Sequence, residues 1–471
     1  MTSSSPVSSF RAGMRRVARN PAQAVPMARW LARALRLRLR RLAELTRHRA
    51  AGRHRLAAYP LGARIAAEGP RAAAVFAASG RVTTMSRCEH ADILVADDPV
   101  EDEEAPDGAA VVVLSSAAAR LSVPAFDPLK TNPINWKPRT AKPILASDAT
   151  GETDPVSRAA ALAALAGAGA VVLVGDDDRC LRPMLGSELH DLMADSERIA
   201  GADAHELEAV SIDMRRCALR DHSLRARARQ VTAAARQRAD PPTVSVLLAT
   251  NRPERLAAAV ASVAAQNYPA VELVLATHGD GFAADSVAAA VETVAAPTRV
   301  VQVEAAEPLG GVLNAAVAAS TGELLAKFDD DDHYGADHIW DLVLTHEYSQ
   351  AQLVAKGAEY VYLAGQDVTL RMFGRRGERY LNYPGVSGGA MLVSRHDLAA
   401  AGGWRRVRSQ VDTGLARDVT RIGGRIYRTH GRGYLRVRHG RDHTWKIQES
   451  HFTGRAAERR EGLDLAFAGI G

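Results

Sequence analysis

The stretch ELLAKFDDDD, residues 323–332, decides the fold, because an apolar run there ends in four consecutive aspartates. The run is as long as a typical buried strand. Polar side chains directly after a buried strand are typical of the carboxyl edge of an open α/β sheet, where ligands usually bind. We therefore expect residues 323–328 to form a strand and the aspartates to lie at a binding edge.

Three further apolar runs precede this stretch, and helical segments separate them. The expected strands are VSVLLAT (244–250), VELVLAT (271–277) and TRVVQVE (298–304), and the expected helices lie near 251–266, 284–294 and 309–320. Such alternation predicts an α/β domain with a mixed, mainly parallel sheet flanked by helices. Pro241 and Pro242 cannot continue a helix, so we place the domain at 242–450, followed by a C-terminal tail at 451–471.

The four aspartates pose a problem of charge. Adjacent carboxylates repel one another unless a cation intervenes. In an extended segment Asp329 and Asp331 point to the same side. This D-x-D spacing suits Mn²⁺ or Mg²⁺, with phosphate oxygens as most of the remaining ligands. A solvated acidic turn is the alternative, and these residues alone leave both open.

The N-terminal half has its own alternation of strands and helices. Its apolar runs are 71–77, 91–98, 109–116, 143–147 and 170–177, and residues 204–238 read as one or two charged helices. We predict a Rossmann-like α/β domain at 61–238. No GxGxxG motif or P-loop accompanies it, so no nucleotide is assigned to this half.

Composition limits the class of protein. With 471 residues, 47% hydrophobic and 24% charged, the chain is predicted to be globular, with two or three domains. It has no run of 18 uncharged apolar residues, so we expect no membrane span. The three cysteines are far apart and lack CxxC spacing, which favours the cytoplasm.

The positive charge is concentrated in a tail at residues 1–60. Residues 1–56 carry fourteen arginines and one acidic residue, whereas the whole chain has a net charge of +6. Within the tail, residues 27–45 form a basic amphipathic pattern, which suits peripheral contact with anionic lipid on the inner face of the membrane. Packing on the protein itself or on a partner chain is the alternative. No nucleic-acid motif accompanies the charge, so no nucleic-acid partner is predicted.

Five segments, in order, resemble a family 2 glycosyltransferase with a GT-A fold. They are VSVLLATNRPERL (244–256), SVAAQNYPAVELVL (262–275), GGVLNAAVAASTGELLAKFDDDD (310–332), SGGAMLVSRHDLAAAGGW (387–404) and VDTGLARDV (411–419). The resemblance implies transfer of a sugar from a nucleotide-sugar donor, with inversion, to a glycan or lipid-linked acceptor. It suggests a role in bacterial cell-surface polysaccharide synthesis.

The resemblance assigns roles to the acidic residues. Asp329 and Asp331 correspond to the metal pair and Asp332 to their support, while Asp330, the variable position between them, is placed among the nucleotide-sugar contacts. Asp412 corresponds to the general base, although Val411 stands where the family has a second acid. A helix N-cap is the alternative role for Asp412.

Other residues are assigned to the metal, acceptor and donor. A late histidine is a further metal ligand in several family members, which makes His439 or His443 the candidate. Gly389 and Trp404 are placed at the acceptor, with a core position as the alternative for Trp404. The donor contacts are Ala249, Thr250, Arg252, His278 and Asn314.

Two departures from the family leave the donor open. The second strand closes with Thr277-His278-Gly279-Asp280, where the family commonly has Asp-Asp-Gly-Ser. The residue before Asn314 is Leu313, where the family commonly has arginine. The identity of the nucleotide base is therefore not predicted, and His278 is named only as a substitute contact.

The N-terminal half also carries a resemblance. DPLKTNPINWKP (127–138) and RRCALRDHSLRARARQ (215–230) are similar to the Rossmann-type domain of spore-coat CgeB-like glycosyltransferases, which resembles half of a GT-B enzyme. This implies an accessory domain to which no catalysis is assigned.

Three functions fit these observations. The first is the metal-dependent inverting glycosyltransferase. The second is a metal-dependent phosphohydrolase or nucleotidyltransferase that uses the same aspartates. The third is a noncatalytic glycan-binding protein, in which the departures at Thr277-His278 and Val411 mark lost activity. The oligomeric state is left open.

Overall fold

The computed structural model describes residues 154–234, 241–372, 378–381, 385–439 and 449–471, together with short stretches between residues 65 and 146. The predicted amphipathic helix at 27–45 and His443 lie outside the described residues, as does the predicted domain boundary at 239–241 in part. Residues Leu61–Gly471 form one compact unit. Among the described helices, none is both long and apolar enough to cross a membrane.

Short parallel strands form the first part of this unit. Four of them make the sheet β2-β1-β3-β4, and β5 pairs with β6. Their bounds are Ile65–Glu68 (β1), Thr83–Thr84 (β2), Ile93–Ala96 (β3), Ala110–Val113 (β4), Arg139–Leu145 (β5) and Ala170–Leu173 (β6). The last four overlap predicted strands. The strand predicted at 71–77 is wrong at its one described residue, because Val75 is helical.

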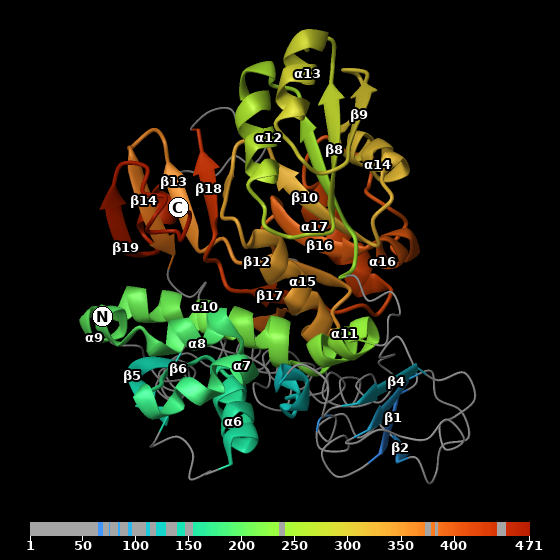
Figure 1. Cartoon of the computed structure of the whole chain (residues 1–471). Coiled ribbons are helices and arrows are strands. Elements are labelled where there is room, and N and C mark those ends of the chain that lie inside the picture. The colour runs from blue at the N-terminus through green and yellow to red at the C-terminus, as the bar shows by residue number, and fades with distance from the viewer. Residues whose placement is uncertain are drawn as a thin grey trace, which may run out of the picture. The chain divides into compact units, whose positions relative to one another are not determined.

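Helices follow these strands. They are α6 (Pro155–Gly167), α7 (Arg182–Leu185), α8 (Ser187–Ala194), α9 (Ser196–Gly201), α10 (Ala204–His222) and α11 (Leu224–Ala234), with 3₁₀ turns at Ala119–Ser122 (η4) and Asp176–Leu181 (η5). Helix α10 starts at a reciprocal cap, since Asp203 accepts from the backbone N–H of Glu206 at 2.9 Å and the Glu206 carboxylate accepts from that of Asp203 at 2.8 Å. Its apolar face covers α6 and the β5-β6 pair (Figure 1).

The predicted domain at 242–450 is built around an eight-stranded sheet. Its order is β15-β17-β12-β16-β10-β7-β8-β9, and β16 and β15 run antiparallel to their neighbours. The bounds are Val244–Thr250 (β7), Val271–His278 (β8), Thr298–Val303 (β9), Leu324–Asp329 (β10), Leu353–Lys356 (β12), Arg379–Leu381 (β15), Ala390–Ser394 (β16) and Ile426–Thr429 (β17). The mixed, mainly parallel sheet confirms the predicted fold class.

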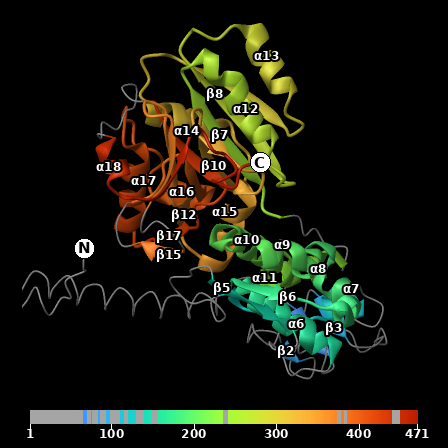
Figure 2. The same cartoon turned by 90° about the vertical axis from the view of Figure 1, so that its left-hand side faces the viewer.

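Helices cover both faces of this sheet. Alternate residues of the central strands enter two separate cores, as Leu248 and Phe328 do on one face and Leu247 and Leu325 on the other. The first face packs against α12 (Leu256–Ala264), α13 (Ala284–Glu292) and α15 (His338–Ser349), and the second against α14 (Leu309–Ala319), α16 (Arg395–Ala400) and α17 (Val411–Arg421) (Figure 2). Burial on both faces explains why the central strands are continuous apolar runs. The turn η6 (Pro253–Arg255) leads from β7 into α12.

A five-stranded sheet stands beside the large one, in the order β11-β18-β13-β14-β19 (Figure 1). Its strands are His333–Tyr334 (β11), Tyr360–Leu363 (β13), Val368–Met372 (β14), Tyr434–Arg438 (β18) and Ala456–Glu461 (β19), and Ser450–Thr453 forms α18. Residues 451–471, predicted as a tail, thus supply β19, which pairs with β14. Phe467 is also buried, against Tyr360.

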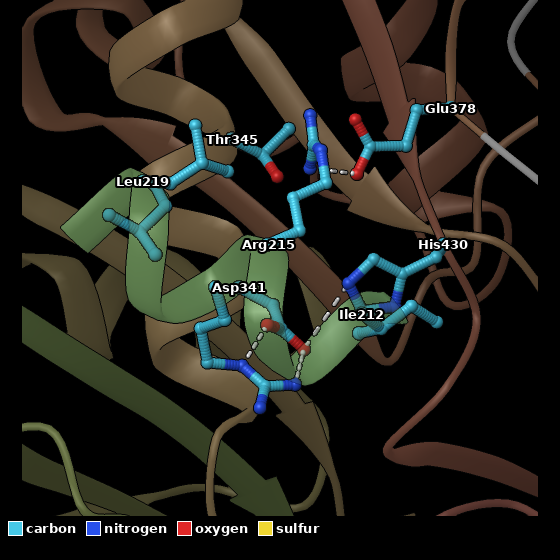
Figure 3. Close-up of a pocket in the computed structure, with 9 residues that line it drawn as sticks. Ile212, Arg215, Leu219, Asp341, Thr345, Glu378 and His430 are labelled. Atoms are coloured by element: carbon cyan, nitrogen blue, oxygen red, sulfur yellow. Dashed lines mark hydrogen bonds and ion pairs between the residues drawn. The ribbon is translucent and has the colours of Figure 1, made fainter. Parts of the chain in front are cut away.

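Charged contacts join α10 to the large sheet and its helices. Arg215 Nη1 lies 2.9 Å from Glu378 Oε1, and Arg216 Nε lies 2.7 Å from Asp341 Oδ1 on α15. Both pairs line a small polar pocket that His430 also borders, as Figure 3 shows. Although burial alone would raise the pKa of Asp341, the charges of Arg216 and Lys356 hold it well below its usual range.

Candidate functional site

The aspartates lie at the carboxyl edge of the large sheet. Asp329 is the last residue of β10 and pairs with Ala249, the penultimate residue of β7. Strand β8 is the next neighbour of β7 and ends at His278. The three parallel strands therefore bring the aspartates, Ala249, Thr250 and His278 to one edge of the sheet.

A buried lysine binds the first aspartate. Lys327, two residues earlier on β10, has only 5% of its surface exposed. Its ammonium group contacts Oδ1 of Asp329 and donates to the carbonyl oxygen of Gly388 at 3.0 Å. Burial alone would lower the pKa of Lys327, but the charge of Asp329 and its hydrogen bond raise it. The lysine is therefore a fixed cation at this edge.

Asp330 is not a solvated residue between two ligands. It is buried, and its Oδ2 accepts hydrogen bonds from the Thr250 hydroxyl at 2.5 Å and from Nε of Arg252 at 3.1 Å. The guanidinium of Arg252 also lies 3.0 Å from Oδ2 of Asp331. Thr250, Arg252 and Asp330 thus form one network, in which Asp330 joins the ends of β7 and β10.

Asp332 connects this edge to the five-stranded sheet. Its Oδ2 accepts from the Tyr434 hydroxyl at 2.6 Å, and its Oδ1 accepts from the backbone N–H of Val437 at 3.0 Å. Burial, and then the negative charges of Asp329 and Asp331, raise the pKa of Asp332 to about 8, against the opposing charge of Arg436. Strand β18 therefore holds the last aspartate of the cluster.

Asp412, about 80 residues after the aspartates in the sequence, lies on the other side of the Gly388-Gly389 segment from them. Helix α17 begins at Val411, and its N-cap is Gln410, in the left-handed region at φ 61°. Asp412 is thus in the first turn, so the alternative of an N-cap role for it is wrong. Its Oδ2 lies 2.5 Å from the point where a Cβ on Gly388 would stand.

The next glycine, Gly389, faces the aspartate cluster. A Cβ built on Gly389 would lie 2.5 Å from Oδ2 of Asp332 and 2.8 Å from Oδ2 of Asp329. Only glycine leaves room for these two oxygens. Gly388 and Gly389 therefore separate Asp412 from the cluster by the thickness of one backbone segment.

Other predicted residues have different surroundings. The Asn314 side chain makes two hydrogen bonds with the backbone of Trp404, at 2.7 and 2.9 Å. Trp404 itself is 3% exposed and lies in the core on the α14 side, which is the second of the two positions that the sequence allows for it. His278 ends β8, and its Nε2 is buried and lacks a hydrogen-bond partner. His439 follows β18 directly.

The predictions omit several residues of this edge. Lys327, Tyr334 and Tyr434 all bond to the aspartates or to the Gly388-Gly389 segment, and Tyr334 donates to the carbonyl oxygen of Gly389 at 2.8 Å. The lysine had a signal in the sequence. A charged residue inside an otherwise apolar strand needs a buried partner of opposite charge, and the nearest is Asp329.

The residues suit a hard divalent cation chemically. The donor atoms are carboxylate oxygens, which Mn²⁺ and Mg²⁺ prefer. The Oδ2 atoms of Asp329 and Asp332 converge beside Gly389, in a space that a Cβ would fill. In the part of the chain that the structure describes, however, no group of three or more His, Cys, Asp or Glu side chains is arranged to hold a metal ion. The metal role of these residues stays a prediction.

Comparison with known proteins agrees with the motifs. Residues 246–400 match the family model described as glycosyl transferase family 2, which confirms the predicted resemblance over that part of the chain. Similar solved structures include the mannosyltransferase PcManGT from Pyrobaculum calidifontis in complex with GDP-Man and Mn²⁺, at 16% identity and a TM-score of 0.34 over 43% of this chain and 59% of that one. They also include S. aureus TarS 1-349 in complex with UDP-GlcNAc, at 14% identity and a TM-score of 0.36 over 45% of this chain and 64% of that one. This chain thus spans about three fifths of the solved structures it matches. The curated proteins gave no match.

Proposed function

We propose that this chain, whose residues 246–400 belong to glycosyl transferase family 2, is a metal-dependent inverting glycosyltransferase. It moves a sugar from a nucleotide-sugar donor to a hydroxyl group of a glycan or lipid-linked acceptor. The observation that carries the proposal is the approach of Asp412 to the aspartate cluster across Gly388 and Gly389. A base and a diphosphate-binding edge are the two parts that a single displacement needs.

Asp412 acts as the general base. The acceptor oxygen forms a bond to the anomeric carbon while the bond from that carbon to the diphosphate breaks. Asp412 takes the proton of the acceptor hydroxyl, and the nucleoside diphosphate leaves with the electron pair. The first turn of α17 suits this role, because the side chain of Asp412 is partly exposed and so reaches the acceptor.

The aspartate edge holds the donor. A bound Mn²⁺ or Mg²⁺ ion supplies positive charge to the diphosphate leaving group. Asp329 and Asp331 would hold the ion, with Asp332 as their support and His439 or His443 as a further ligand. The guanidinium of Arg252, which contacts Asp330 and Asp331, would bind the same phosphates, and Ala249 and Thr250 would adjoin the nucleoside.

The cellular role is proposed on the family resemblance. The enzyme acts in bacterial cell-surface polysaccharide synthesis from the cytoplasmic side, and residues 27–45 make peripheral contact with the membrane. The two solved structures above bind GDP-Man and UDP-GlcNAc respectively, which supports a nucleotide-sugar donor without selecting its base.

A thermal-shift screen of nucleotide sugars tests the donor site. With Mn²⁺, the correct donor should raise the melting temperature of the wild type by about 3 °C or more at saturating concentration. Asp331→Asn should remove most of that shift, because it removes a charged ligand. Absence of stabilisation by any nucleotide sugar, or an equal shift in Asp331→Asn, would contradict the metal-donor proposal.

A transfer assay on Asp412→Asn is the matched test of the base. This variant should bind donor as the wild type does and lose transfer by about 100-fold or more. A phosphohydrolase or nucleotidyltransferase would instead turn over the donor with metal but without any sugar acceptor. A noncatalytic glycan-binding protein would bind donor without transfer, and Asp412→Asn would change nothing.

A further inference from the structure

Lys327 is a buried charged residue in an otherwise apolar part of strand β10. In register, its neighbours across β10 are Leu247 on β7 and Met391 on β16, both buried. An ammonium ion in such surroundings is costly unless it is paired and hydrogen-bonded. The partners of this ammonium group therefore explain why it is tolerated here.

The ammonium group of Lys327 touches both halves of the proposed site. It contacts Oδ1 of Asp329 in the aspartate cluster, and it donates to the carbonyl oxygen of Gly388, the residue whose Cα faces Asp412. The other oxygen of Asp329, Oδ2, lies beside Gly389 together with Oδ2 of Asp332. This buried cation therefore contacts Asp329 directly, and the charge of Asp412 also raises its pKa.

A cation at this point lowers the net negative charge that Asp329 and Asp412 present. A second positive ion is attracted less strongly to carboxylates that an ammonium group already neutralises in part, because the two cations repel each other. The same group fixes the position of Asp329 and of the Gly388 carbonyl. Its charge and its contacts therefore have separate consequences.

We propose that Lys327 is a positioning residue that serves as a permanent internal cation of the donor site. It weakens the binding of a free divalent ion to the aspartates, so that the ion binds well only when the donor diphosphate adds its own negative charge. It also holds the Gly388-Gly389 segment between Asp412 and the aspartates. This inference rests on the proposed function.

Titration with Mn²⁺ alone tests the charge, without relying on activity. Binding of Mn²⁺ to the full chain is followed by the electron paramagnetic resonance signal of the free ion. Lys327→Met should bind Mn²⁺ about tenfold more tightly than the wild type, although its transfer rate should fall. Lys327→Gln keeps a hydrogen-bond donor but removes the charge, and should also bind Mn²⁺ more tightly.

Lys356→Met is the matched control. Lys356 is likewise buried in this domain, and its Nζ lies 2.6 Å from Asp341 Oδ2, in the contact with α10. Its loss removes a buried cation from a carboxylate, as the loss of Lys327 does, but outside the proposed site, where Arg216 still pairs with Asp341. This variant should lose stability and bind Mn²⁺ as the wild type does.

The outcomes separate the inference from the function on which it rests. Unchanged or weaker Mn²⁺ binding in a folded Lys327→Met overturns the inference, as does wild-type Mn²⁺ affinity in Lys327→Gln should Lys327→Met fail to fold. Tighter binding in Lys356→Met also overturns it, because the effect would then be general. In all three cases metal-dependent donor binding by the wild type would leave the proposed function standing. If the wild type binds no nucleotide sugar, it is the proposed function that fails.

Discussion

At the scale of single residues, the site depends on positions where the chain has no side chain. Gly388 leaves room for the carboxylate of Asp412, and Gly389 leaves room for the carboxylates of the aspartate cluster. Side chains from two separate parts of the sequence can therefore approach the same backbone segment. The oxygen atoms lie within 3 Å of where a Cβ would be, which is closer than a carbon atom tolerates. The glycines therefore matter through the space they leave.

Gly388→Ala tests this point. The new methyl group would lie 2.5 Å from Oδ2 of Asp412, so the carboxylate must move. We expect transfer to fall by about 100-fold, because small displacements of a reacting group are costly, while donor binding changes little. Steady-state kinetics with donor and acceptor varied separately measure both effects.

Gly201→Ala is the control for this substitution. Nothing lies within 4 Å of the position of its Cβ, so the variant should retain wild-type kinetics. Equal transfer rates in Gly388→Ala and the wild type would show that Asp412 is not fixed by this contact.

The residues of the site were predictable to different degrees. The aspartates stand in one run, and their place after an apolar strand reveals the edge. The contacts of Asp332 do not follow from the sequence, because Tyr434 and Val437 are more than 100 positions away and no local pattern links them. Lys327 was visible in the sequence, but its second partner, Gly388, is 61 residues distant.

At the scale of elements, buried charges join α10 to the part of the chain that matches the family model. The side chains of Arg215 and Glu378 are 5% and 0% exposed. Glu378 also accepts from the hydroxyl groups of Tyr427 at 3.3 Å and Thr429 at 3.1 Å. Burial alone would lower the pKa of Arg215, but the charge of Glu378 raises it.

Arg215→Met should destabilise the fold by about 3–5 kcal/mol, because it leaves the Glu378 carboxylate buried without its cation. Urea denaturation followed by circular dichroism measures the free energy of unfolding. The control is Arg182→Met, which breaks the exposed pair with Asp191 and should change stability little. A loss in Arg215→Met as small as that in the control would mean that the Arg215–Glu378 pair does not stabilise the position of α10.

Elements were predicted best where they are buried on both faces. The runs at 244–250 and 271–277 became β7 and β8 almost residue for residue, since such strands admit few polar positions. Strand β19 was missed because it lies at the edge of its sheet, and its sequence AAERRE is charged and mostly exposed. Only its pairing with β14 makes it a strand.

At the scale of the whole molecule, buried histidines make stability depend on pH. His222 and His338 have none of their surface exposed. Burial, with the charge of Arg227, lowers the pKa of His222 to about 4, and burial, with the charge of Lys356, holds that of His338 well below its usual range. Both side chains are therefore neutral in the folded protein at pH values where the unfolded chain binds protons.

Each of these two histidines should therefore contribute less stability as the pH is lowered from about 6.5 towards 4. The unfolded state takes up protons first, so each histidine contributes a slope of up to about 1.4 kcal/mol per pH unit in this window. The raised pKa of Asp332 acts in the opposite direction, because its folded state binds a proton that the unfolded state does not bind. The contribution of one histidine is therefore measured as a difference between variants. Between pH 7.5 and 5.5, the free energy of unfolding of His222→Gln in urea should fall by about 1 kcal/mol less than that of the wild type, and an equal change in both proteins would contradict the prediction.

Asp332 is hydrogen-bonded to β18, a strand that lies outside the part of the chain that matches the family model. The family match ends at residue 400, before Asp412 and before the strand that holds Asp332 through Tyr434 and Val437. That strand lies in a sheet completed by β19, near the C-terminus. Helix α10 precedes the matched residues, and its Arg215 and Arg216 form ion pairs with Glu378 and Asp341 inside them. The smallest part of the chain that can carry the proposed reaction is therefore much longer than the segment that identifies its family, and it reaches from α10 to the last strand.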